Sequence, residues 1–363
     1  MGQLIDRRVP TIDLPVVNLG PYLTDPGSSA ALAECEKAWK AMANFGVSVV
    51  RDPRAELRHR ARFLQLMQCF GAATPELQED CRRDQTGMAI GWWPPGRETA
   101  RHWPEVVEGL TEENRPFTAG FDRPPPDRKG RWHHRLWLPE WERNMADGLL
   151  ATLKGEQIAP PGEQFEGWIE ANDLWGRTLL SANITHAEMV ALGAGVERDY
   201  FTAGIINGGT SLLAPTIVDM SKLNEWELIA GFHYDFDRFA MHGKANFGGL
   251  IVWTRDGRRV RIRVPGNCFL CQAGAEAEYM TGGAIWKGFH EVVALPREIE
   301  VARTIRSAGG SPIRVGSHCF SQGRSDVMQP HPKWRTEQTL AAYPPILASD
   351  RQAYEIRLIT GQA

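Results

Sequence analysis

The sequence predicts an α+β protein with a mainly helical N-terminal half and a C-terminal half made of short strands. Three observations support this class. Apolar residues recur at helical spacing before about residue 205, short apolar runs bounded by Gly and Pro follow it, and strands and helices do not alternate regularly. The spacing of the short runs favours a β-sandwich or a barrel-like jelly roll for the second half. With 363 residues the chain is long enough for one large domain or two ordinary ones.

The helical half starts with a short predicted strand, VPTIDL at 9–14. An amphipathic helix is expected from about Ser28 to Asn44, and Gly46 closes it before the strand VSVV. The run AELRHRARFLQLMQCFG predicts a second helix that ends at Gly71. Longer helices are expected at about 139–155 and 165–193.

The regular pattern fails between 84 and 135, where Pro, Gly, Arg and Trp are frequent. We predict a long loop here that acts as a lid or binding element, with a disordered excursion as the alternative. Its aromatic and basic residues are candidate substrate contacts, although the tryptophans are also suited to packing and the arginine to solvent. The candidates are Trp92, Trp93, Arg97 and Trp132.

The strand-like half contains the runs SLLAP, FHYDF, GGLIVW, VRIRV, CFLCQ, FHEVVAL and IRVGSHCF. In VRIRVP the apolar and basic residues alternate, which is typical of a half-buried strand. The pair Cys268 and Cys271 has the C-x-x-C spacing of some metal sites. Because strand residues three apart face opposite ways, we do not expect these sulfurs to share a metal.

Composition narrows the function classes. Hydrophobic residues make up 42% and charged residues 23% of the chain, and the formal net charge is -3, which argues against a dedicated nucleic-acid binder. No run has the length or apolar character of a signal peptide or a membrane span. The sequence therefore predicts a cytoplasmic protein.

Two histidines are followed two residues later by an acid, which is close to the roughly one pair expected by chance from the composition. His186 and Glu188 lie in a helical run, where residues two apart diverge. His233 and Asp235 lie in the strand-like run AGFHYDFDRF, where residues two apart share a face. An imidazole and a carboxylate on one face provide two thirds of a 2-His-1-carboxylate site for Fe(II).

The third ligand is expected to be a histidine on a distant strand. His242, in MHGKANFGG, is predicted to lie in a turn, and His331 is flanked by prolines. His290 opens the apolar run FHEVVAL after a glycine-rich turn and is the natural candidate, with a buried structural histidine as the alternative.

In their order along the chain these motifs resemble the isopenicillin N synthase-like Fe(II)- and 2-oxoglutarate-dependent oxygenases. The resemblance is carried by VPTIDL, AWKAMANFGVSVVRD, LLAPT, FHYDFD, FGGLIVW, GNCFLCQAG and FHEVV. It implies a double-stranded β-helix core with helices packed outside it. It also implies Fe(II) bound by His233, Asp235 and His290, with 2-oxoglutarate and O2 as cosubstrates. The expected division is an N-terminal region at 1–204, the core at 205–330 and a C-terminal helical segment at 331–363, within one structural domain.

The family binds the distal carboxylate of 2-oxoglutarate with an Arg-x-Ser motif on the last core strand. Here IRVGSHCF supplies Arg314, but Gly316 stands at the serine position. The next residue, Ser317, is a candidate substitute for binding the cosubstrate, although adjacent strand residues face opposite ways. Arg303 and Arg306 are rivals for the arginine. We favour Arg314, because a guanidinium on an apolar strand requires a carboxylate partner.

The resemblance implies an oxygenase that hydroxylates, desaturates or cyclises a small molecule while 2-oxoglutarate is converted to succinate and CO2. The alternatives are an Fe(II)/O2 oxidase of the same fold that does not use 2-oxoglutarate and a binding homologue without activity. A metal-independent jelly-roll module is a third alternative.

Overall fold

A computed structural model describes residues 9–84, 90–101, 103–140, 157–206, 209–323 and 327–360. Two sheets contain most of the strands. The larger sheet runs in the order β2 (Val16–Asn18), β3 (Val47–Arg51), β12 (Phe269–Ala273), β9 (Phe239–Gly243), β14 (Ile313–Ser321), β6 (Leu212–Leu213), β5 (Gly130–Arg135) and β4 (Gly91–Trp93), with β7 (Thr216–Asp219) paired to β14 and β5.

The smaller sheet has five strands, and a separate two-stranded sheet lies near the C-terminus. The five strands are β1 (Thr11–Ile12), β11 (Arg259–Ile262), β10 (Leu250–Trp253), β13 (His290–Val293) and β8 (Leu228–His233); the pair is β15 (Val327–Met328) and β16 (Ile346–Leu347). The helices are α1 (Gly20–Thr24), α2 (Ser29–Phe45), α3 (Leu57–Gly71), α4 (Pro75–Asp80), α5 (Pro104–Val107), α7 (Trp168–Gly193), α8 (Ala203–Ile206), α9 (Ala275–Met280), α10 (Pro296–Ser307), α11 (Glu337–Ala342) and α12 (Ala348–Thr360).

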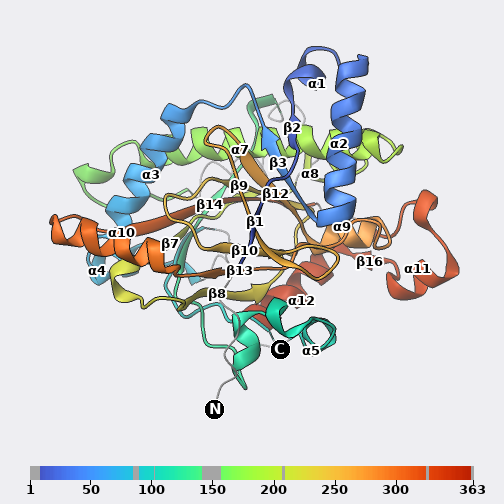
Figure 1. Cartoon of the computed structure of the whole chain (residues 1–363). Helices are drawn as coiled ribbons and strands as arrows, with labels where there is room; N and C mark the ends of the chain where they lie inside the picture. Colours follow the sequence, from blue (N-terminus) through green and yellow to red (C-terminus); the bar gives the residue numbers. More distant parts are fainter. Residues whose placement is uncertain are drawn as a thin grey trace.

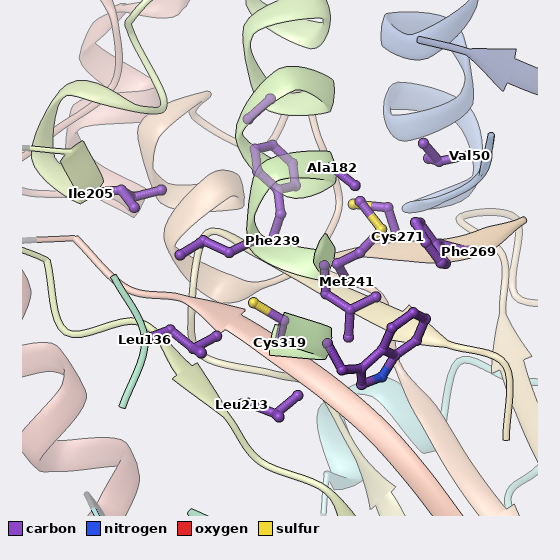
Figure 2. Packing of buried hydrophobic residues seen from close by; sticks show 14 of the residues in the cluster. Val50, Leu136, Ala182, Ile205, Leu213, Phe239, Met241, Phe269, Cys271 and Cys319 are labelled. Atoms are coloured by element: carbon purple, nitrogen blue, oxygen red, sulfur yellow. The ribbon is translucent and has the colours of Figure 1, made fainter. Parts of the chain in front are cut away.

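The main hydrophobic core lies between the larger sheet and the long helices. Helix α7 packs against β9 and β14, and α3 packs against β14 and β7. The helices α2 and α7 lie on one side of the strands, and α5 and α12 lie on the opposite side (Figure 1). Figure 2 shows part of this core, where Phe239 and Met241 of β9 meet Ala182 of α7 and Cys319 of β14.

The alternation of side chains in β9 and β14 decides what faces the second sheet. Phe239 and Met241 belong to the helix-side core, so the positions of β9 that alternate with them face the other way. His242 is one of them, and its ring lies 6.2 Å from that of His290 on the smaller sheet. The inner faces of the two sheets therefore meet around polar side chains.

The helices that the described residues cover confirm the predictions made from periodicity. Helix α2 ends where Gly46 adopts a φ of 69°, a left-handed conformation that favours glycine. Helices α3 and α7 match the second and fourth predicted helices. Cys268 and Cys271 pack in different clusters on opposite faces, as expected for a strand.

The segment 84–135 differs from the predicted loop. Its end, β5, is an inner strand of the larger sheet, and the edge strand β4 pairs with it. The sequence did not predict these strands because they are surrounded by glycine and proline, and because their inward-facing residues are polar. The alternation of apolar and polar residues that normally indicates a strand is therefore weak here. The predicted helix at 139–155 lies largely outside the described residues. Within the described part of the chain, no helix combines the length and the apolar character needed to cross a membrane.

Candidate metal centre and adjoining cavity

The structure brings His233, Asp235 and His290 together. Strand β8 ends at His233, Asp235 follows two residues later, and His290 opens β13 directly opposite His233 in the antiparallel register. One potential ligand atom from each residue lies within 4.8 Å of the other two. Such a set of two imidazoles and one carboxylate on one side has the composition of a facial iron site.

Backbone carbonyls orient both imidazoles. His233 Nδ1 lies 2.6 Å from the carbonyl oxygen of Gly231, and His290 Nδ1 lies 3.1 Å from that of Gly288. A carbonyl only accepts, so each Nδ1 carries the proton and each Nε2 keeps a free lone pair. A hydrogen bond of this kind fixes the tautomer of a metal-binding histidine.

The electrostatics of the triad suit a cation. Burial, together with the neighbouring His290, lowers the pKa of His233 to about 3, so its ring is neutral at physiological pH. Asp235 Oδ2 is buried and has no hydrogen-bond partner among the described residues. A buried carboxylate oxygen without a partner is costly, and a metal ion would satisfy it.

A network of buried charges stands beside the triad. Glu98 accepts hydrogen bonds from Arg131 at 2.8 and 3.1 Å and from Lys129, which also donates to Asp127 at 2.6 Å. Burial alone would raise the pKa of Glu98, but Arg131 and Lys129 hold it well below its usual range. Two cations and two anions therefore balance each other at the edge of the site.

This network also reaches the backbone that orients the first ligand. Asp127 Oδ1 accepts a hydrogen bond of 3.0 Å from the amide of Gly231. The carbonyl of the same Gly231 accepts the proton of His233 Nδ1. The charge network thus holds the amide N–H of Gly231, and the His233 imidazole is hydrogen-bonded to the carbonyl of the same residue.

Arg314 is buried on the inner face of β14. Its Nε donates to the carbonyl of Gly248 at 3.1 Å, and no carboxylate of the described residues lies within ion-pair distance. Burial lowers the pKa of Arg314 to about 10, while Glu298 opposes the shift. The rivals Arg303 and Arg306 lie on α10, where they contact Glu225 and Ser221 near the surface. Among the three predicted arginines, only Arg314 is buried.

The hydroxyl group beside Arg314 belongs to Thr216, which the sequence did not suggest as a cosubstrate contact. A Cβ on Gly243 would lie 2.4 Å from Ser317 Oγ and 2.6 Å from the Trp175 ring, which places Ser317 on the helix side of β14. A Cβ on Gly316 would instead lie 2.9 Å from Thr216 Oγ1 and 3.4 Å from Arg314 Nη1. Thr216 faces Gly316 in the β7–β14 register, a pairing that only the folded sheet reveals.

The sequence also did not predict that His242 and His318 lie on the inner face of the larger sheet. His242 was predicted in a turn, but it lies within β9, directly opposite His318 of β14. Their rings meet edge to face with centroids 4.7 Å apart. Burial, with the nearby His290, lowers the pKa of His242 to about 3. The prediction failed because the run MHGKANFGG contains the glycines and the asparagine of a turn.

A cavity of about 290 Å³ adjoins the triad. His233 and Asp235 line it, and aromatic and aliphatic side chains form much of its wall. These include Trp103, Leu212, Phe320, Ile356 and Ile359. Helix α12 forms one side, because the amide of Thr99 donates to the carbonyl of Ile359 at 3.0 Å and Tyr234 donates to Glu355 at 2.9 Å. A small molecule would fit this space.

The predicted substrate contacts in segment 84–135 mostly lie elsewhere. Trp92 and Trp132 belong to the main core, where Phe70 packs edge-on against both. Trp93 lies against His133, and Arg97 pairs with Asp84 near the surface at 2.8 Å. None of these four predicted residues lines the cavity described here. Their neighbours on β5, Arg131, His133 and Arg135, line it instead, because alternate residues of that strand face inward.

No protein-family model matches the sequence, and no curated protein is similar to it in sequence. Solved structures match it over nearly its whole length. A 2OG-Fe(II) oxygenase family protein from Caulobacter crescentus has a TM-score of 0.67 at 20% identity, covering 95% of this chain and 98% of that one. A full-length Neurospora crassa protein in complex with alpha-KG and thymine has a TM-score of 0.70 at 16% identity, covering 96% of this chain and 97% of that one.

JOX2 in complex with 2OG, Fe and JA has a TM-score of 0.65 at 14% identity, covering 98% of this chain and 90% of that one. At these identities the likeness shows a common fold. The chain has the fold of structures described as 2OG-Fe(II) oxygenases.

Proposed function

We propose that the protein is an Fe(II)- and 2-oxoglutarate-dependent oxygenase that oxidises a small molecule. The observation that carries the proposal is the convergence of His233, Asp235 and His290, with a buried carboxylate oxygen that has no hydrogen-bond partner among the described residues. The fold shared with such oxygenases supports the same function.

The donor atoms suit Fe(II). His233 and His290 each offer a free Nε2, and Asp235 offers a carboxylate oxygen. Three protein ligands on one side leave positions open for a cosubstrate and O2.

Arg314 and Thr216 suit the distal carboxylate of 2-oxoglutarate. A buried guanidinium without an acidic partner in the described residues is unfavourable until an anion binds. The Thr216 hydroxyl oxygen lies 2.9 Å from the point where the Cβ of a residue at position 316 would stand, so it offers a hydroxyl close to the missing serine. Cation and hydroxyl together offer charge-assisted and neutral hydrogen bonds to one carboxylate. This arrangement favours a 2-oxoglutarate-dependent enzyme over an oxidase that does without the cosubstrate.

The residues of this chain bind, orient and shield the reactants. When bound, Fe(II) with 2-oxoglutarate and O2 supplies the oxidising power for attack on an unactivated C–H bond, with succinate and CO2 as coproducts. The cavity beside His233 and Asp235 would hold the substrate, and its apolar wall would place one C–H bond near the metal. Helix α12 would exclude water from the cavity. Hydroxylation is the simplest outcome, and desaturation and cyclisation use the same parts.

The same proposal includes an arrangement of the domain, a kind of partner and a cellular location. The two facing sheets would form the double-stranded β-helix, with residues 205–330 as the core, 1–204 packed on it and 331–363 closing the site. The partner would be a small molecule, and a cytoplasmic location stays a prediction.

The test is product formation by protein loaded with Fe(II) without oxygen. Succinate and O2 uptake are measured with and without 2-oxoglutarate, while mass spectrometry follows a library of small molecules. We expect succinate release that requires Fe(II), O2 and 2-oxoglutarate, and one library compound that gains oxygen or loses two hydrogens. Oxygen uptake that ignores 2-oxoglutarate would indicate the oxidase instead, and no iron binding would indicate a binding protein.

A further inference from the structure

The inner face of the larger sheet carries two histidines that the triad does not use. His242 of β9 and His318 of β14 are register partners, and their rings are nearly perpendicular at 4.7 Å. Both are mostly hidden from solvent. Buried imidazoles in place of aliphatic residues cost desolvation, so hydrogen bonds or a ligand have to offset this cost.

His242 stands next to the metal ligands. Its Nε2 lies 3.8 Å from Asp235 Oδ2, and its ring centroid lies 6.2 Å from that of His290. This Nε2 is buried and has no hydrogen-bond partner among the described residues. Because it faces a carboxylate oxygen, electrostatics favour the proton on Nε2, which makes it a donor without an acceptor.

His318 lies between His242 and Arg314. Its Nδ1 donates to the carbonyl of Ala214 at 3.3 Å, which fixes the ring. Its Cε1 lies 3.0 Å from the point where a Cβ on Gly316 would stand, and Arg314 Nη1 lies 3.4 Å from that point. The two histidines therefore occupy the region between the triad and the buried arginine.

The two histidines lie outside the described lining of the substrate cavity. The described residues that line the substrate cavity include His233 and Asp235, but not His242, His318 or Arg314. His242 thus lies beside Asp235 but outside this lining, and its Nε2 has no acceptor within hydrogen-bond distance among the described residues. An anionic group between the triad and Arg314 would supply the missing acceptor.

We propose that His242 Nε2–H donates a hydrogen bond to the carboxylate that a 2-oxo acid places beside the metal, and that His318 positions the His242 ring. The inference rests on the proposed function and adds a cosubstrate contact to it. Arg314 with Thr216 would hold one end of the 2-oxo acid, and His242 would hold the other. No covalent change in either histidine is involved.

The test uses 2-oxoglutarate itself as the probe. The full-length protein is loaded with one Fe(II) without oxygen and titrated with 2-oxoglutarate, and the visible charge-transfer absorbance gives both the affinity and the band position. His242→Leu keeps the bulk and removes the donor, whereas His242→Gln keeps an N–H donor. We expect about a tenfold weaker affinity and a shifted band for His242→Leu, and less than about a threefold change for His242→Gln.

Iron content and circular dichroism of each variant separate loss of the contact from loss of the fold. If His242→Leu does not fold, His242→Met replaces it as the apolar variant. His318→Asn, whose amide still reaches a carbonyl, is expected to retain the wild-type affinity, and His318→Ala is expected to lose part of it. Recovery by the asparagine distinguishes positioning from simple packing.

Two results would overturn the inference, and they differ. If wild-type protein gives the charge-transfer band and His242→Leu binds 2-oxoglutarate as tightly, the contact is absent while the proposed function stands. If iron-loaded wild-type protein gives no response to 2-oxoglutarate, the proposed function fails and the inference fails with it.

Discussion

The chain contains the pattern histidine-x-acid in two regions, one on α7 and one at the end of β8. On α7, His186 Nε2 lies 2.8 Å from Ser48 Oγ, while Glu188 contacts Arg198 at 2.7 Å on another side of the helix. At the end of β8, His233 and Asp235 converge with a third residue from a distant strand. The same three-residue pattern is structural in a helix and forms a candidate metal site in a strand. The backbone conformation and the non-local partner decide between these outcomes, not the pattern.

The largest effect is expected from removing a ligand of the strand pair. Asp235→Ala, His233→Ala or His290→Ala removes one of three ligand atoms, so Fe(II) binding and succinate formation should fall by more than about a hundredfold, the upper range for outer-shell changes. Metal analysis and succinate assays check this. The matched control is His186→Gln in the helical pair, which should leave both unchanged. Normal turnover in any of the three alanine variants would refute the assignment.

Removal of the buried cation should have the next largest effect. Arg314→Met loses charge-assisted hydrogen bonds of about 1.5–3 kcal/mol, so half-saturation should require about ten- to a hundredfold more 2-oxoglutarate. Iron content should not change, because Arg314 does not contact the triad. Arg306→Met on the surface of α10 is the control. If both variants show wild-type half-saturation, Arg314 is not the anchor.

Thr216 allows a finer test of the same anchor. Thr216→Ala removes one hydroxyl, which is worth about 0.5–1.5 kcal/mol, and should raise the half-saturating 2-oxoglutarate concentration by about two- to tenfold. Gly316→Ser in the same protein should restore the affinity, because the serine occupies the space that Thr216 Oγ1 leaves. Gly316→Ser alone should weaken binding through the close contact with Thr216. Wild-type affinity of the Thr216→Ala variant would show that no hydroxyl is needed there.

The last prediction concerns the helical pair and the stability of the fold, not activity. Burial lowers the pKa of His186 to about 3, below the value near 6.5 of an unfolded histidine. Between these values the unfolded chain binds a proton that the folded protein does not, so stability falls as pH falls through this window. In urea unfolding of metal-free protein at pH 7.5 and 5, His186→Gln should reduce this loss by up to about 1.4 kcal/mol per pH unit. An unchanged slope would mean that His186 is already protonated when folded.

Local signals in the sequence predicted the helices and the strands that bear the triad. His290 was found because a glycine-rich turn and an apolar run frame it, and Arg314 because it lies on an apolar strand. Thr216 and His318 could not be found in this way, because their position depends on strand register, which is set by contacts far apart in the chain. His242 was misassigned to a turn by the glycines around it.

The tryptophans of segment 84–135 also depend on a strand that the sequence did not predict. Trp132 lies on a strand between inward residues, so the same strand buries its ring against Phe70 and turns His133 toward the cavity. Residue type alone left Trp132 as a candidate substrate contact, with packing as the alternative. The alternation along β5 reverses this assignment, and it became visible only once the strand was known.

The iron assignment is tested most directly by the Fe(II) stoichiometry of wild-type protein and Asp235→Ala, measured by calorimetric titration without oxygen. We expect one tightly bound Fe(II) per chain in the wild type and a loss of tight binding in Asp235→Ala, with His186→Gln behaving as the wild type. Wild-type protein that binds no Fe(II), or Asp235→Ala that binds it equally well, would refute the assignment.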